Sequence, residues 1–323
     1  MRSALVFIHG IGGVRDPEAE RDSWLAALAV GARRAGHSFE GSALEQNSFT
    51  DTAFAYYGDL FVRPQAQGSA ASLGDAAGED EALRLLLEEV IDTQLPSCSS
   101  EEERRVLQVA RAQLTATGRQ AQGSGELVRR LVNVCTTLLA LPGIRRGGQW
   151  ASGRLMAGHL SQVTRYLARA ELDDGRTLDE RIRGRVLSFM DESRPTVVIA
   201  HSLGSVVALE ALHQHRGTVP LLVTVGSPIG MRTVVHPRLR PQPPATPECV
   251  GRWLNYWDRD DIIAPRPWLE RDVLPNTGGC QPVSGRVDSD GIWVHTATKY
   301  LAQASVAGPV VEALRLAGES APA

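Results

Sequence analysis

Five short runs of apolar and β-branched residues, each followed by a turn signal, constrain the fold of this chain most. They lie at Ala4–Ile8, Ala53–Tyr57, Thr196–Ala200, Leu221–Val225 and Trp253–Tyr256. Continuous apolar runs of this length are typical of strands that are buried on both faces of a sheet. Helical patterns separate several of them, and this alternation favours a parallel sheet with helices on both sides. We therefore predict an α/β fold in three layers with a mostly parallel sheet.

Three helical patterns flank these strands. Residues Ser23–Arg34 follow the first strand, and Ser205–His215 follow the third. The segment Thr177–Met190 precedes the third strand, and its Thr177 and Glu180 have the spacing of a capping box. Each pattern predicts a helix that packs against the sheet.

The chain between the second and third strands is far longer than the dozen or so residues that a crossover needs. Residues 65–80 are rich in Gly, Ala and Ser without periodicity, which predicts a mobile linker. Four helical patterns follow, at Leu83–Ile91, after Ser100 with Glu103 as its capping partner, at Leu127–Leu141 and at Trp150–Ala170. We predict a core formed by residues 1–64 and 176–323 and a helical insertion at 65–175. Because the insertion leaves after a strand, at the edge where parallel sheets bind ligands, we expect it to act as a lid.

The sharpest local signal is Ala200-His201-Ser202-Leu203-Gly204, where a buried strand runs directly into a helix. This is the pattern of a nucleophile elbow, in which a strained turn exposes the serine hydroxyl. Small residues are needed at Ala200 and Gly204 because the turn is pressed against neighbouring backbone. A serine in a short motif is ordinarily a surface or capping residue, but the strand before and the helix after favour Ser202 as a nucleophile. The Leu203 N–H would then point at the reacting carbonyl.

A second signal, His9-Gly10-Ile11-Gly12-Gly13, ends the first strand. Glycines let backbone N–H groups approach an anion without obstruction by side chains. The run could be a turn that binds nothing or a dinucleotide loop, but its glycines do not make the G-x-G-x-x-G pattern. Together with the elbow, it favours an oxyanion loop with the Ile11 N–H as second donor and His9 and Gly10 in support, as Gly204 supports the elbow.

An acidic turn follows the fifth strand and offers Asp258, Asp260 and Asp261. A catalytic triad needs one carboxylate that fixes the tautomer of the histidine and stabilises the imidazolium. Asp261 precedes two isoleucines whose burial would anchor its backbone, so we favour Asp261 and keep Asp260 as the alternative.

His295 lies between an apolar run and the last helical segment. Of the eight histidines, it alone follows both the serine and the acid, while five others lie in polar or helical surroundings and two lie in the motifs above. The order Ser202, Asp261, His295 is the order of triad residues in α/β-hydrolases. It predicts His295 as the catalytic base.

In these motifs, the chain resembles the α/β-hydrolase superfamily, and within it the lipase and esterase group. The lipase-like motifs are His9-Gly10, Ala200–Ser205, Gly226–Pro228 and the acid turn Asp261–Pro265, which is similar to that of fungal-type lipases and of bacterial relatives of glycosylphosphatidylinositol inositol deacylases. Because the first strand begins at residue 4, the resemblance implies a hydrolase core with a reduced N-terminus.

The resemblance implies a serine esterase that acts on small-molecule or lipid esters through an acyl-enzyme and needs no metal or organic cofactor. A thioesterase or an acyltransferase could use the same residues. A peptidase, or a ligand-binding protein that keeps the fold without turnover, is a more distant alternative.

The composition restricts the classes of partner that we expect for this chain. The net charge of −3 gives no positive field for nucleic acid. The four cysteines are scattered, without metal-binding spacing, and the first apolar run is too short for a signal peptide, so we expect a cytoplasmic protein without a transmembrane segment. The apolar run Leu131–Leu141 could line an acyl pocket, touch a lipid surface or pack inside the insertion. The oligomeric state stays open.

Overall fold

The fold is taken from a computed structural model of the chain. The structure describes residues 3–13, 15–62, 73–98, 100–115, 124–141, 152–259, 261, 263–264, 267–289 and 295–319.

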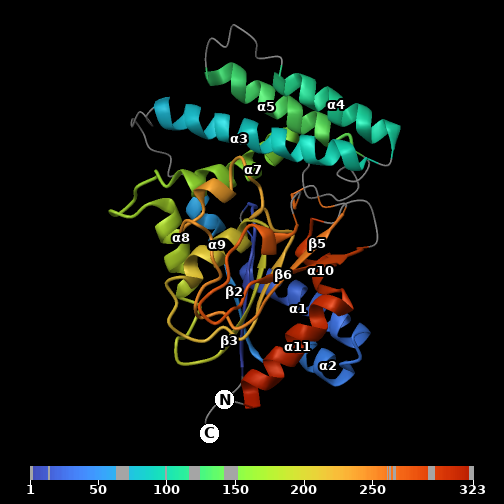
Figure 1. The fold of residues 1–323 in the computed structure, drawn as a ribbon, viewed down its shortest axis with the longest axis vertical. Helices are drawn as coiled ribbons and strands as arrows, with labels where there is room; N and C mark the ends of the chain where they lie inside the picture. The colour runs from blue at the N-terminus through green and yellow to red at the C-terminus, as the bar shows by residue number, and fades with distance from the viewer. Residues whose placement is uncertain are drawn as a thin grey trace.

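A parallel sheet of six strands forms the centre of the molecule, in the order β2-β1-β3-β4-β5-β6 (Figure 1). The strands are β1 (Ala4–Ile8), β2 (Asp51–Ala55), β3 (Thr196–His201), β4 (Leu222–Val225), β5 (Trp253–Asp258) and β6 (Pro282–Val287). The chain runs outward from β1 to β2 and then returns to build the other half of the sheet from β3. The order therefore reverses between β1 and β3, and the carboxyl ends of two such strands form the usual ligand crevice of an open α/β sheet. The predicted α/β class and parallel sheet are confirmed.

Side chains of each strand alternate between two apolar layers. In β1, Val6 and Ile8 pack on one face of the sheet, and Leu5 and Phe7 pack on the other. Helices α1 (Pro17–Arg34), α2 (Ser38–Glu45), α10 (Ala297–Leu301) and α11 (Ala304–Glu319) lie on the Phe7 side, and α8 (Leu178–Leu187) and α9 (Leu203–Leu212) lie on the Val6 side. Helices thus cover both faces of the sheet, which gives the three layers that the alternation of patterns predicts.

Strands β2 and β6 are among the departures from the predicted strands, and both have local reasons. The second run was predicted to extend to Tyr57, but β2 ends at Ala55 because the Tyr57 N–H donates to the side chain of His9 instead of to a neighbouring strand. Strand β6 has no predicted counterpart. It is one of the two edge strands, begins with Pro282 and is largely exposed in its middle, so it lacks the apolar run of a buried strand.

The helix boundaries follow their caps. Helix α8 begins after the predicted capping box, in which Thr177 and Glu180 each bond to the backbone of the other. Helix α1 starts at Pro17, earlier than the predicted Ser23, because the Asp16 side chain caps it by accepting from two backbone N–H groups and proline is favoured in a first turn.

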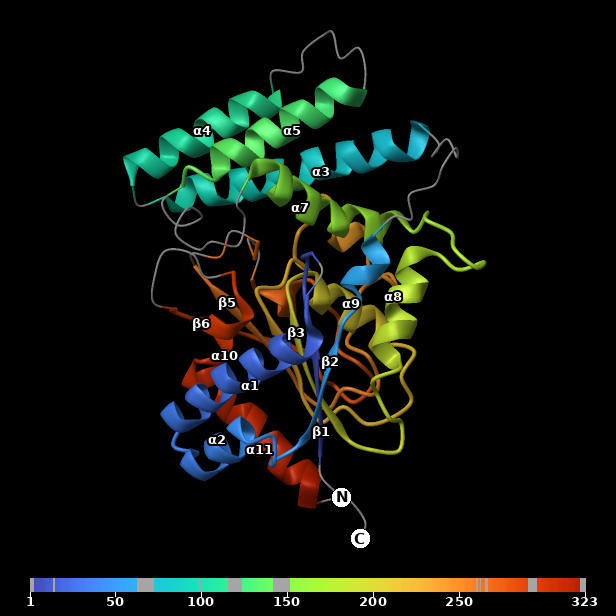
Figure 2. The same cartoon turned by 180° about the vertical axis from the view of Figure 1, so that it is seen from behind.

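The segment between β2 and α8 contains four long helices, α3 (Leu73–Gln94), α4 (Glu101–Thr115), α5 (Ser124–Leu138) and α7 (Gly153–Ala168). Figures 1 and 2 show them stacked at the end of the sheet opposite to the N-terminus. Since all strands run parallel from the end where β1 begins, the helices lie beyond the carboxyl ends of the strands. Short 3-10 turns at Gly58–Phe61, Leu95–Ser97, His236–Arg238 and Leu269–Arg271 complete the described elements.

The predicted linker at 65–80 is wrong in its second half. Helix α3 begins at Leu73, so residues 73–80 are helical, and residues 65–72 lie outside the described part of the chain. The composition was misleading because Ala76 and Ala77 are strong helix formers and acidic residues favour the first turns of a helix.

The apolar run of α5 packs inside the insertion. Leu131, Val134, Cys135 and Leu138 are buried with the apolar side chains of the neighbouring helices. These side chains are therefore unavailable for contact with a lipid surface. Within the described residues, no helix has the length and apolar composition to span a bilayer.

A buried charge cluster joins the end of α7 to the core. Glu210 of α9 accepts from Tyr166 at 2.8 Å and from Arg169 at 2.6 Å, and it also lies 3.2 Å from Arg183. Asp179 binds the same two arginines at 2.6 Å. Both carboxylates are 2% exposed, so the cluster is screened little by water.

Replacement of Glu210 by leucine should destabilise the fold, because it leaves Arg169 and Arg183 with one carboxylate for two buried charges. We expect a loss of about 3 to 5 kcal/mol in the free energy of unfolding, measured by urea denaturation. Glu45→Leu is the matched control, since Glu45 forms a surface ion pair with Arg33 and should change the midpoint far less. Equal effects of the two variants would contradict the assigned role of the cluster.

Candidate active site

Ser202 occupies the turn between β3 and α9, at the point where the strand order reverses. Its backbone has φ 55° and ψ −130°, a conformation that a residue with a side chain adopts only under strain. The Ser202 N–H is held by the carbonyl of Val225 at 3.1 Å, and its carbonyl accepts from the Ser205 hydroxyl at 2.6 Å. The turn is thus fixed from both sides, as the predicted elbow requires.

The loop after β1 lies directly against this turn. A Cβ atom on Gly204 would overlap the carbonyl oxygens of Ile8 and His9, and one on Gly10 would lie 2.5 Å from the Ser202 Cβ. Larger residues at these two positions would push the loop and the elbow apart. Ala200 is completely buried in the apolar core, so a methyl group is accommodated there.

Ser202, His295 and Asp261 form a continuous hydrogen-bonded chain. The distance from Ser202 Oγ to His295 Nε2 is 2.9 Å, and the distance from His295 Nδ1 to Asp261 Oδ2 is also 2.9 Å. All three side chains are almost fully buried. Of the two acids that the sequence left in competition, Asp261 contacts His295, while Asp260 lies outside the described residues.

The surroundings of Asp261 keep it ionised. Burial alone would raise the pKa of this carboxyl, but the charge of His295 and hydrogen bonds from His295, Tyr300 and the Ile263 N–H together lower the pKa below its usual value. Tyr300 donates to Oδ2 at 2.7 Å, and the Ile263 N–H donates to Oδ1 at 2.9 Å. An ionised Asp261 can only accept, so His295 carries its proton on Nδ1 and leaves Nε2 free to accept from Ser202.

Gly226 leaves room for Asp261 and His295 to meet. It has φ 57°, and a Cβ atom there would lie 2.7 Å from Asp261 Oδ2 and 3.2 Å from His295 Nδ1. Glycine is required on both counts, since a side chain would be strained and would enter the contact between acid and base. This residue opens the Gly226–Pro228 motif of the sequence.

His9 orients the loop after β1. Its Nε2 accepts from the Tyr57 N–H at 3.1 Å, so the ring proton is on Nδ1 and is donated to the Gly10 carbonyl at 2.6 Å. Burial, and then the charge of Arg15, lower the pKa of His9 to about 3, so the ring is neutral. Because a peptide group is planar, the direction of the Gly10 carbonyl also sets that of the Ile11 N–H.

The other expected donor, the Leu203 N–H, belongs to the first residue of α9. The first N–H groups of a helix have no partner within the helix and carry its positive end. The structure therefore brings Leu203 and the Ile11 loop to the same strand ends as Ser202, together with the supporting residues His9, Gly10 and Gly204.

Sequence reasoning missed three side chains that hold the site. Tyr300 bonds to the acid, the Tyr57 hydroxyl donates to the His9 carbonyl at 2.5 Å, and Gln162 of α7 bonds to the backbone of Gly12. Tyr300 lies five residues after the predicted His295, but nothing in the sequence identifies the acid as its partner. The other two contacts join distant segments and leave no local pattern.

A pocket of about 310 Å³ opens beside the base. Its lining comes from the loop after β1, the start of α1, the end of β3 and the segment around His295: His9, Gly10, Arg15, Glu20, Ser23, Trp24, His201, His295, Thr296, Ala297 and Thr298. Polar side chains predominate in this lining. Burial is the main cause that lowers the pKa of His201 well below its usual value, and the charge of Arg15 adds to it, so this neighbour of His295 is neutral.

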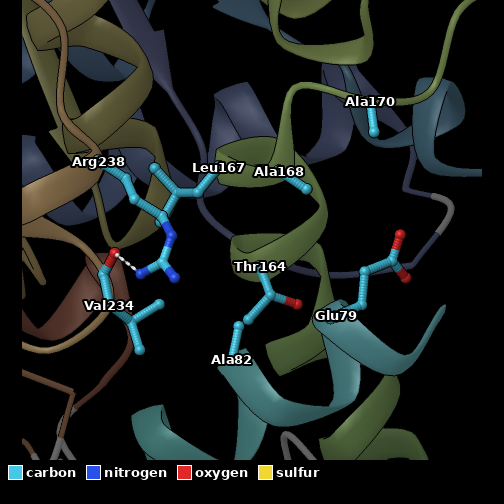
Figure 3. Close-up of a pocket in the computed structure, with 9 residues that line it drawn as sticks. Glu79, Ala82, Thr164, Leu167, Ala168, Ala170, Val234 and Arg238 are labelled. Atoms are coloured by element: carbon cyan, nitrogen blue, oxygen red, sulfur yellow. Dashed lines mark hydrogen bonds between the residues drawn. The ribbon is translucent and has the colours of Figure 1, made fainter. Parts of the chain in front are cut away.

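A second pocket of about 240 Å³ lies between α3, α7 and the chain after β4 (Figure 3). Arg238 lines this pocket and donates to the Val234 carbonyl at 2.9 Å, and Glu79 and Thr164 line it as well. Its lining contains no member of the hydrogen-bonded chain. Among the described residues, no group of His, Cys, Asp or Glu has the arrangement of a metal site.

Comparison with known proteins adds no relative: no protein-family model, no curated protein and no solved structure matches this chain.

The buried neutral His9 predicts a pH dependence of stability. Its pKa is about 3 in the folded protein and near 6.5 when unfolded, so in this window the unfolded state binds more protons and stability falls as the pH falls. His9→Gln should reduce the slope of unfolding free energy against pH by about 1.4 kcal/mol per pH unit between about pH 6 and 4. Urea denaturation across this range measures it, and an unchanged slope would show that His9 is not held neutral.

Proposed function

We propose that this chain is a serine hydrolase of the α/β-hydrolase fold that cleaves carboxylic ester bonds. One observation carries the proposal: a single buried histidine contacts both the hydroxyl of a serine in a strained turn and the carboxylate of an aspartate. A serine used only to cap a helix needs neither partner. The combination of strain, buried base and ionised acid is what activation of a hydroxyl requires.

The proposed reaction has two stages. His295 takes the proton from Ser202 as Oγ attacks the ester carbonyl, and Asp261 stabilises the resulting imidazolium. The Leu203 and Ile11 N–H groups stabilise the tetrahedral oxyanion, and His295 then protonates the departing alcohol. Water, deprotonated by the same histidine, releases the acyl group in the second stage. The chemistry uses side chains and backbone alone.

The fold supports this assignment. The serine and the glycine loop follow the two strands between which the strand order reverses, where open α/β sheets bind ligands. The helices α3, α4, α5 and α7 lie beyond this edge, and we propose that they form a lid over the site (Figure 2). The motifs at His9-Gly10 and Ala200–Ser205 resemble those of lipases and esterases, which is the reason to propose an ester substrate, including lipid esters.

A thioesterase or an acyltransferase is the nearest alternative, because the same three residues serve thioesters and other acceptors. Turnover of p-nitrophenyl esters of increasing chain length, compared with acyl thioesters, separates these activities. A peptidase or a non-catalytic binding protein is more distant, and an intact hydrogen-bonded chain argues against the loss of turnover.

Ser202→Ala tests the nucleophile. The variant should fold as the wild type does, lose covalent labelling by a fluorophosphonate and lose ester turnover by several orders of magnitude. Labelling is read by mass spectrometry of the peptide that contains residue 202. Retention of more than about a tenth of the wild-type kcat would remove Ser202 from the mechanism.

Asp261→Asn tests the acid. It should lower kcat by about 10⁴-fold, as the same change does in a serine protease, because the amide favours the wrong tautomer of the histidine. Asp260→Asn, the same substitution one residue earlier, is the matched control and should have a much smaller effect. If the two effects are reversed, the acid is Asp260.

A further inference from the structure

Gln162 of α7 joins the insertion to the loop after β1 through two hydrogen bonds. The Gly12 N–H donates to Gln162 Oε1 at 2.9 Å, and Gln162 Nε2 donates back to the Gly12 carbonyl at 2.9 Å. Gln162 is only 7% exposed, so these bonds compete little with water. The side-chain amide of Gln162 thus bonds to both the N–H and the carbonyl of Gly12.

Three successive peptide groups of this loop are fixed. His9 holds the carbonyl of Gly10, in the peptide group that carries the Ile11 N–H. The next peptide is held at both ends, with Arg15 donating to the Ile11 carbonyl at 3.2 Å and the Gly12 N–H bound by Gln162. Gln162 also holds the third, by donating to the Gly12 carbonyl. Two of the three fixed peptide groups therefore depend on a helix of the insertion.

We infer that Gln162 is a positioning residue that holds the oxyanion loop, so that the insertion completes the catalytic site rather than only covering it. The inference rests on the proposed function, since it assigns the Ile11 N–H as an oxyanion donor. Donors that are already aligned stabilise developing charge without reorganisation. A loop free to rotate at Gly12 and Gly13 would lose that alignment, because glycine resists rotation least.

The position of Gln162 on α7 suits this role. Met156, Leu160, Val163 and Tyr166 of the same helix are buried in the apolar core. Arg165 donates to the Phe61 carbonyl at 3.0 Å and pairs with Glu171, and the charge cluster at Glu210 holds the end of the helix. A helix fixed in this way presents Gln162 to the loop at a defined place.

The two hydrogen bonds between Gln162 and Gly12 suit a side-chain amide. Gln162 must accept from an N–H and donate to a carbonyl at the same time, which leucine cannot do. An ionised glutamate can only accept and would set its charge against the Gly12 carbonyl oxygen. A protonated glutamic acid has one donor and one acceptor and can reproduce both bonds. Gln162→Glu is therefore a variant that protonation should repair.

Gln162→Leu should lower kcat for a p-nitrophenyl ester by about tenfold to a hundredfold with little change in KM, because alignment in the transition state is lost while ground-state binding is not. The rate of labelling by a fluorophosphonate should fall in parallel. Gln113→Leu is the matched control: Gln113 lies on α4 of the insertion and accepts from the Thr137 hydroxyl at 2.9 Å, without a bond to the loop. It should leave kcat unchanged.

Gln162→Glu provides the test that does not depend on the leucine variant folding. The ratio of its kcat to that of the wild type should rise as the pH falls from about 8 to 5, as the buried carboxyl becomes protonated. The same ratio for Gln162→Leu should stay flat. A merely structural role would give equal losses in Gln162→Leu and Gln113→Leu, or no pH-dependent recovery, and either result overturns the inference. Failure of the wild type itself to label at Ser202 would instead overturn the proposed function.

Discussion

The close approach of two chain segments at the reversal of the strand order is the constraint on which the site depends. The loop after β1 lies on the turn after β3 with no space for a side chain at Gly204 or Gly10. This contact sets the hydroxyl of Ser202 beside the loop that carries the Ile11 N–H. It also explains why one of the two turns is strained while the other is rich in glycine: the serine must point outward, and the facing backbone must come close.

The buried histidines around this contact differ in their partners. His9, His201 and His295 lie close together, but only His295 has a carboxylate on its far nitrogen. His9 is neutral and bonds to one backbone donor and one backbone acceptor, so both ring nitrogens are used to hold the loop. The surroundings therefore separate the three histidines: His295 contacts a carboxylate, His9 holds the loop and His201 is neutral. In the proposed mechanism, this difference leaves His295 as the base.

The sequence predicted what local physics determines. Buried strands, the elbow and the capping box at Thr177 are visible because each depends on residues near one another in the chain. His295 was found by elimination and by chain order rather than by any local feature. Strand β6, the long start of α3 and the contacts of Tyr300 and Gln162 were not predicted, since an exposed edge strand lacks an apolar run and a hydrogen bond across 150 residues leaves no periodic signal.

Several contacts tie the insertion to the core, and they bear on how the insertion could move. Glu89 of α3 accepts from the backbone N–H groups of Arg232 and Thr233 after β4, Gln162 of α7 binds the loop after β1, and Glu210 binds the end of α7. A buried polar group that loses its hydrogen bond destabilises the structure by about 1 to 3 kcal/mol. Movement of the whole insertion as a rigid body would break several such bonds and is therefore unfavourable. Any movement that displaced α7 would also release the loop after β1, because Gln162 binds Gly12 of that loop. If the insertion is the proposed lid, α7 must keep its position for the loop after β1 to stay aligned. Access to Ser202 would then come from movement of segments other than α7.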